Sequence, residues 1–124
     1  MKRAHKKLDV WRESVDLATN IYKITEDFPK TEIYGLTAQI RRAVISISSN
    51  IAEGAARHSP KEFLHFLTIA GGSLSELDTQ IEIAYNLNFL AAETKQDVDQ
   101  KIESIAAKLA GLIQNIKKKV NIGK

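Results

Sequence analysis

The sequence contains no cysteine, only two prolines and few aromatic side chains. Without cysteine the chain can form neither a disulfide framework nor a thiolate-bound zinc site. No apolar run approaches the roughly 20 residues that a transmembrane helix needs, and the basic start MKRAHKKLDV lacks the apolar stretch of a signal peptide. We therefore expect a cytoplasmic protein whose chemistry does not depend on thiols.

The length and composition are those of one ordinary globular domain. The chain has 124 residues, of which 44% are hydrophobic and 27% are charged, and a domain of this size buries a core without cross-links. Apolar residues recur at spacings of three and four and nowhere alternate over the length of a strand. This pattern predicts an all-α protein and a single domain over residues 1–124.

Four helices are expected. The first runs over about residues 9–28 and ends before Pro29, and the second runs over about residues 32–53 and ends at Gly54. The third begins after Ser59 as N-cap and ends near residue 88, and the fourth begins near Thr94. Short connections make successive helices antiparallel neighbours, so the prediction is an up-down-up-down four-helix bundle.

Gly71 and Gly72 lie in the middle of the third predicted helix, where glycine weakens a helix. We expect this pair to let helix two approach helix three closely.

Basic residues gather in short tails at the two ends of the sequence. Residues 1–7 and 117–124 hold eight of the 18 basic side chains and no acidic one, so residues 8–116 carry a net charge of −5. In the predicted bundle both tails lie beside the turn between helices two and three. The candidate nucleic-acid-binding residues of this end are Lys2, Arg3, Lys6, Lys7, Arg57, Lys61, Lys117, Lys118, Lys119 and Lys124.

Such a basic end is typical of proteins that contact phosphate backbones. The tails lack aromatic side chains, so contact with the backbone is expected rather than reading of bases. The alternative is that the lysines form disordered tails that only improve solubility. The opposite end is expected to be acidic, through Asp27, Glu32, Glu93, Asp97 and Asp99.

Catalytic and metal-binding motifs are scarce. Glu62 and His65 form one E-x-x-H motif, whereas di-iron bundles use two, and Glu62 is better explained as part of a helix cap. The sequence has no nucleophile elbow and no glycine-rich phosphate loop. We therefore expect a protein that is not an enzyme and that holds no cofactor and no metal.

Polar residues flank the expected core between helices two and three. They are Gln39, Arg42, Ser46, Asn50 and Glu53 on one helix and Ser73, Glu76 and Gln80 on the other. If the turn is centred near Arg57 and His58, Arg42 lies opposite Ser73 and can reach Glu76. A structural hydrogen-bonded network is the main interpretation, and a ligand site is the alternative.

Helices one and two carry more apolar surface than one core requires. The candidate oligomer interface consists of Trp11, Tyr22, Tyr34 and Ile45. A monomer would leave these side chains exposed, so self-association is expected.

These motifs carry a resemblance over residues 8 to about 90. Leu8, Val10 and Trp11, Phe28, Pro29 and Glu32, Gln39, Arg41 and Arg42, the run NIAEG at 50–54, and Gly72, Ser73, Glu76 and Leu77 are its signatures. The sequence resembles the bacterial four-helix-bundle family encoded in intervening sequences of 23S ribosomal RNA genes, often labelled S23 ribosomal proteins. Helix four matches only in periodicity.

The resemblance implies a ring-like homopentamer and no enzymatic activity, with Asn50, Glu53, Gly54, Ser73 and Glu76 in structural roles. A related protein is the accessory factor of diversity-generating retroelements, which pairs with a reverse transcriptase and binds nucleic acid. The leading hypothesis is a homo-oligomeric scaffold that binds RNA or DNA backbones through its basic end. The alternative is a protein-interaction module, for example the partner of a reverse transcriptase, with no nucleic-acid binding of its own.

Overall fold

The structure, a computed structural model, describes residues 3–122, which fold into four α-helices and two short 3-10 helices. Helix α1 spans Asp9–Thr25, α2 spans Leu36–Ala55, α3 spans Pro60–Asn86 and α4 spans Ala92–Ile122. The 3-10 helices are η1, Ala4–Lys7, and η2, Lys30–Glu32. No described residue is in a strand, and the all-α prediction is confirmed.

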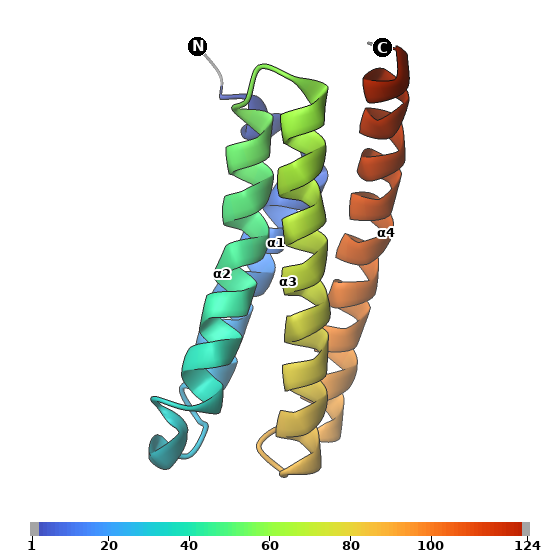
Figure 1. The fold of residues 1–124 in the computed structure, drawn as a ribbon. Coiled ribbons are helices and arrows are strands. Elements are labelled where there is room, and N and C mark those ends of the chain that lie inside the picture. The colour runs from blue at the N-terminus through green and yellow to red at the C-terminus, as the bar shows by residue number, and fades with distance from the viewer. Residues whose placement is uncertain (1–2, 123–124) are drawn as a thin grey trace.

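The four α-helices lie side by side and alternate in direction along the bundle axis (Figure 1). The α1–α2 and α3–α4 connections lie at one end, and the α2–α3 turn lies at the other with the start of α1 and the end of α4. Each helix packs against the next, and α1 also packs against α4. The sequence elements that carry basic residues therefore meet at one end of the bundle.

The core combines one apolar stripe from each helix. Its largest fully buried aliphatic side chains are Leu17, Ile21, Ile40, Val44, Ile47, Ile51, Leu67, Leu77, Ile81, Val98 and Ile105. All of them belong to stripes that the spacing of three and four predicts. Each such side chain stabilises the fold by about 1.5–3 kcal/mol when it leaves water. The apolar stripes, rather than the polar contacts, therefore hold the bundle together.

The starts of the helices agree with the sequence prediction only in part. At α3 the backbone N–H of Glu62 donates to Ser59 Oγ at 3.1 Å, which confirms the predicted cap. Helix α2 begins later than expected, because Glu32 lies in η2 and its carboxylate accepts the N–H of Leu36 at 3.2 Å. Helix α4 begins earlier, since the Lys95 N–H already donates to the carbonyl of Ala91, so Thr94 is not its N-cap.

Two helices also end earlier than the pattern predicts. Helix α1 stops at Thr25, ahead of Pro29, and Phe28 is buried beyond the helix end with its ring 5.5 Å from that of Phe89. Helix α3 stops at Asn86, because Asn88 adopts the left-handed conformation with φ 64°. The Phe89 N–H then bonds to the carbonyl of Ala84 at 2.9 Å and closes the turn.

The close approach of α2 to α3 occurs at Gly54, and the prediction for Gly71 and Gly72 is wrong. A Cβ on Gly54 would lie 2.8 Å from Phe63 Cδ1 and 2.9 Å from Phe66 Cβ. A Cβ on Gly71 would meet only Leu109 of α4 at 3.9 Å, and one on Gly72 would meet nothing within 4 Å. Gly54 is also part of α2, which continues through Ala55.

Candidate nucleic-acid interface

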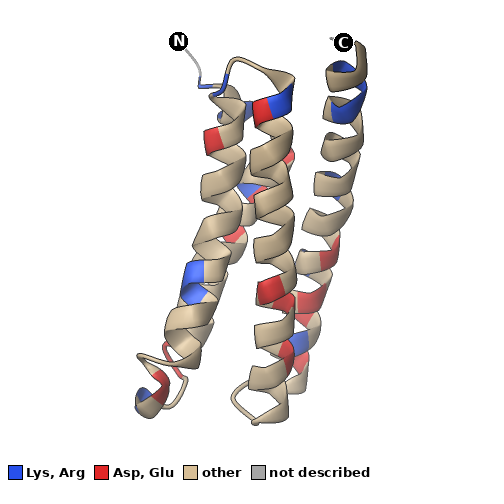
Figure 2. Ribbon diagram, in the orientation of Figure 1, with Lys and Arg blue, Asp and Glu red and all other residues tan. Residues whose placement is uncertain are grey.

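Basic residues from three separate segments lie at one end of the bundle (Figure 2). Arg3, Lys6 and Lys7 belong to η1 and its cap, Arg57 and Lys61 to the α2–α3 turn and the first turn of α3, and Lys117, Lys118 and Lys119 to the last turns of α4. We call these eight residues the basic end. The candidates Lys2 and Lys124 lie outside the described residues.

The two terminal segments of the basic end are helical at Ala4–Lys7 and, in α4, through Ile122. The His5 ring packs edge-on against Trp11 at 4.8 Å, and Arg12 donates to the carbonyl of Lys6 at 2.7 Å, which together fix η1 on α1. At the other terminus Val120 packs against the core. The alternative of disordered tails is therefore wrong for residues 3–7 and 117–122.

Most charges of the basic end have no acidic partner among residues 3–122. Within residues 3–122, Arg57 alone of the eight forms an ion pair, with its Nη2 3.0 Å from Glu53 Oε1. The side chains of Lys7, Lys61 and Lys117–Lys119 are exposed. A polyanion that binds these side chains therefore has to displace only water and counterions.

The opposite end is acidic, but much of its charge is paired. Asp97 binds Lys101 at 2.9 Å, and Lys95 bridges Asp99 of α4 and Glu82 of α3. The hydrogen bond to Asp99 is the main reason why the pKa of Lys95 is raised. Basic residues also lie in the lower half of α2 (Figure 2), so the charge separation along the axis is less complete than the sequence suggested.

The polar flank between α2 and α3 forms a smaller network than predicted. Ser46 Oγ and Ser73 Oγ lie 2.8 Å apart, and Asn50 Nδ2 donates to the carbonyl and the hydroxyl of Ser46 at 2.8 and 2.9 Å. The buried Ser73 and the half-buried Asn50 are therefore both hydrogen-bonded to Ser46.

The predicted Arg42–Glu76 contact is absent among the residues that the structure describes. Ser46, one helical turn beyond Arg42, lies opposite Ser73, because the turn is centred nearer Ser59 than Arg57. Arg42, Glu76 and Gln39 are all exposed and lie along an open groove. Glu53 bonds to Arg57 instead of joining the serine network.

Two polar contacts that α1 makes with its neighbouring helices were also not predicted. Arg41 donates to Thr25 Oγ1 at 2.9 Å and to the Tyr22 carbonyl at 3.3 Å, with its guanidinium 4.5 Å from the Tyr22 ring centre. Only the family signature marked Arg41 in the sequence. The contact fixes α1 against α2 and engages Tyr22, a candidate interface residue.

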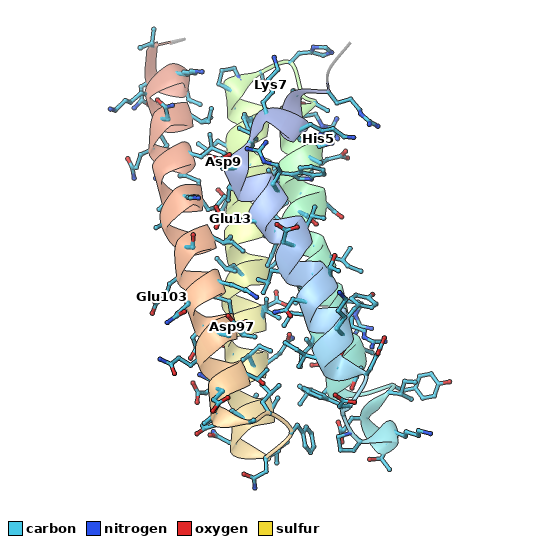
Figure 3. All side chains as sticks on the ribbon, turned by 180° about the vertical axis from the view of Figure 1, so that it is seen from behind. His5, Lys7, Asp9, Glu13, Asp97 and Glu103 are labelled. Carbon is cyan, nitrogen blue, oxygen red and sulfur yellow. The ribbon has the colours of Figure 1, made fainter. Side chains whose placement is uncertain are left out.

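The second unpredicted contact joins α1 to α4. Glu13 lies on the side of α1 that faces α4 (Figure 3), where its carboxylate accepts hydrogen bonds from Ser104 at 2.6 Å and from Lys108. The bond from Lys108 is the main cause of the lowered pKa of Glu13, and Ser104 lowers it further. No motif distinguishes this glutamate from other surface acids, which is why the sequence did not reveal it.

The candidate interface residues divide into two places. Tyr34, Ile45 and Tyr22 are 95%, 43% and 36% exposed and lie along the groove, which has a volume of about 1070 Å³ between α1, α2 and α3. Ile33 and Ile69 add further exposed apolar surface to it. Trp11 is half-buried under His5 and lies outside this groove.

The described residues contain neither a cluster of metal-binding side chains nor a helix that could span a membrane. No three His, Asp or Glu side chains within residues 3–122 lie close enough to hold a metal ion. Glu62 of the E-x-x-H motif faces Ser59, whose hydroxyl lies 3.2 Å from its carboxylate. No helix in this part of the chain is both long and apolar enough to cross a bilayer.

Together, the alternating helices, the Ser46–Ser73 seam and the basic end define a small antiparallel four-helix-bundle protein. The model of the 23S rRNA-intervening sequence protein family matches residues 6–111, so the chain belongs to this family. The match extends into α4, beyond the region where the sequence signatures lie.

A solved structure supports the fold. The protein of unknown function from the S23 ribosomal protein family of Bacteroides thetaiotaomicron superposes with a TM-score of 0.79 at 22% identity, covering 85% of this chain and 95% of that chain. No curated protein sequence matches the chain. The relation to diversity-generating retroelements stays a prediction.

Proposed function

We propose that this chain is a non-enzymatic, cytoplasmic, homo-oligomeric scaffold that binds RNA or DNA backbones through its basic end. One observation carries the proposal: seven basic residues lie at one end of the bundle and have no acidic partner among the described residues. They are Arg3, Lys6, Lys7, Lys61 and Lys117–Lys119. Each lysine or arginine that neutralises a phosphate releases counterions, which favours binding at low salt.

Self-association supports the same function. The groove with Tyr34 and Ile45 exposes apolar side chains that a second copy would cover. In a ring such as the proposed homopentamer, all subunits point the same way and present their basic ends on one face. Many weak phosphate contacts then act together and raise the overall affinity.

The test compares the natural protein with Lys117, Lys118 and Lys119 all changed to Gln. Substitution is preferable to deletion, because Val120 packs against the core. Fluorescence anisotropy with labelled RNA duplex over a salt series should show weaker binding and a slope of log K against log salt that is shallower by about 0.9 per lost phosphate contact. A matched control changes the exposed Lys23 and Lys30, away from the basic end, to Gln.

Light scattering on the same samples should give a mass several times the 13.8 kDa of one chain, unchanged by the substitutions. A natural protein that binds no nucleic acid at low salt, or a triple variant with an unchanged slope, contradicts the proposal. In that case the protein-interaction module, with a reverse transcriptase as one possible partner, is the better interpretation of the exposed groove.

A further inference from the structure

A small pocket lies at the basic end beside the α2–α3 turn. Its lining consists of Arg57, Lys61, Glu62, His65 and Phe66, and its volume is about 420 Å³. We call it the turn pocket. His65 is exposed, and Phe66 is half-buried with its ring 5.4 Å from the His65 ring. The pocket thus combines two aromatic rings with two cations.

The arrangement differs from what the sequence suggested. The tails contain no stacking side chains, but the fold brings His65 and Phe66 of α3 to the same end as the lysines. The Arg57 guanidinium lies 4.9 Å from the centre of the Phe66 ring. Adjacent cations and aromatic rings are the two components with which proteins bind single-stranded nucleic acid.

Two acidic groups lie near the pocket, and of these two only Glu53 is paired with a cation within residues 3–122. The Glu62 carboxylate accepts a hydrogen bond from the Ser59 hydroxyl at 3.2 Å, and Glu53 is paired with Arg57 at 3.0 Å. A phosphate would compete with Glu53 for Arg57, whereas Lys61 has no acidic partner within residues 3–122. The strength of the Glu53–Arg57 pair therefore limits anion binding at this pocket.

We infer that the turn pocket is a subsite for single-stranded nucleic acid, in which a base stacks on the exposed His65 ring while Lys61 and Arg57 hold the adjacent phosphate. The Phe66 ring, at 71° to that of His65, supports His65 edge-on. The inference rests on the proposed function, because the neighbouring lysines supply most of the affinity. A duplex keeps its base faces stacked inside, so it gains the phosphate contacts without the stacking contact. The basic end should consequently bind a single strand in preference to a duplex of equal charge once salt weakens the phosphate contacts.

The experiment measures anisotropy of a labelled oligouridylate, the matching oligodeoxythymidylate and a blunt RNA duplex. His65→Ala should weaken binding of both single strands by about tenfold, as loss of one stacked base does, and leave duplex binding unchanged. His58→Ala is the matched control, since His58 is an exposed histidine of the adjacent α2–α3 turn and does not line the pocket.

Two further variants examine the remaining parts of the pocket. Phe66→Leu keeps apolar volume and removes the ring that supports His65 edge-on. It should weaken single-strand binding selectively, but by less than His65→Ala does; thermal unfolding checks that the variant is folded. Glu53→Gln releases Arg57 and should strengthen binding of the single strands.

The outcomes separate this inference from the proposed function. If the natural protein binds single strands and duplex, but His65→Ala and His58→Ala behave alike, the turn pocket is not a stacking subsite and the electrostatic scaffold is unaffected. If the natural protein binds none of the three probes at low salt, the proposed function fails and the subsite fails with it.

Discussion

The α2–α3 and α1–α4 interfaces join neighbouring antiparallel helices of one bundle by different means. Helices α2 and α3 share the most contact of any pair, with no side chain at Gly54 and with the buried Ser73 bonded to Ser46. Of the neighbouring pairs, α1 and α4 share the least contact. The Glu13 carboxylate of α1 accepts hydrogen bonds from Ser104 and Lys108 of α4.

The difference between these two interfaces shows which kind of residue determines how closely two helices pack. The absent side chain of Gly54 and the part-buried Ser46–Ser73 pair fit only one register. A shift by one residue would bring a Cβ or an unpaired hydroxyl into the interface. A partly exposed ion pair tolerates small shifts and is screened by salt. We therefore expect substitutions at the α2–α3 interface to have larger effects than those at α1–α4.

The largest effect is expected at Gly54. In Gly54→Ala the new Cβ would lie 2.9 Å from Phe66 Cβ and 3.2 Å from the Phe63 carbonyl oxygen. Neither atom is the end of a flexible side chain, so the helices must separate, at a cost of about 2 kcal/mol. Urea unfolding measures this difference.

Gly72→Ala is the matched control for Gly54→Ala. Its Cβ would meet nothing within 4 Å, so the higher helix propensity of alanine should stabilise the protein by about 1 kcal/mol. Equal effects of the two substitutions would show that glycine acts only through helix propensity and that the close approach is unimportant.

A smaller effect is expected at Ser73. Ser73→Ala removes one hydrogen bond of Ser46, but Asn50 still donates to the Ser46 hydroxyl, so no buried group is left without a partner. The expected loss is about 1 kcal/mol in the free energy of unfolding. Ser75→Ala, on the exposed side of the same helix, should be nearly neutral. If both variants unfold at the same urea concentration, the serine pair does not stabilise the interface.

The sequence was sufficient for the fold but not for the register of the α2–α3 pair. Ile40, Ile47, Leu67 and Leu77 occupy the stripes that their spacing predicts, since burial depends only on the face of each helix. Register depends on where the turn is centred, and a displacement of about two residues puts Ser46 rather than Arg42 opposite Ser73. The same displacement explains why the Arg42–Glu76 contact was wrong.

Glycine positions could not be distinguished by sequence alone. Gly71 and Gly72 lie as a pair in the middle of α3, and for that reason close approach was predicted there, while Gly54 resembled an ordinary helix end. Only the relative rotation of two packed helices decides which glycine faces a neighbour. The turn pocket was missed for a related reason: its lining residues all lie within residues 57–66, but the sequence pattern does not show that His65 and Phe66 of α3 face Arg57 and Lys61.

The smallest effect is expected at the α1–α4 interface. Glu13→Gln keeps the size of the side chain and removes the charge that Lys108 and Ser104 recognise. Because Lys108 is exposed and the pair is accessible to solvent, the loss of stability should be smaller than that of Ser73→Ala. Added salt should reduce the difference from the natural protein further.

The pH dependence of the free energy of unfolding tests whether the charge on Glu13 causes the effect of Glu13→Gln. The folded-state pKa of Glu13 lies below its ordinary value of 4.5, so the carboxylate stabilises the fold at pH values above 4.5. That contribution is lost as the pH falls below 4.5 through the lowered pKa, since the group is then protonated in both states. Urea unfolding at neutral pH should therefore distinguish Glu13→Gln from the natural protein, and the two curves should converge in acid. A difference that persists unchanged in acid would mean that Glu13 stabilises the α1–α4 interface by packing and not by its charge.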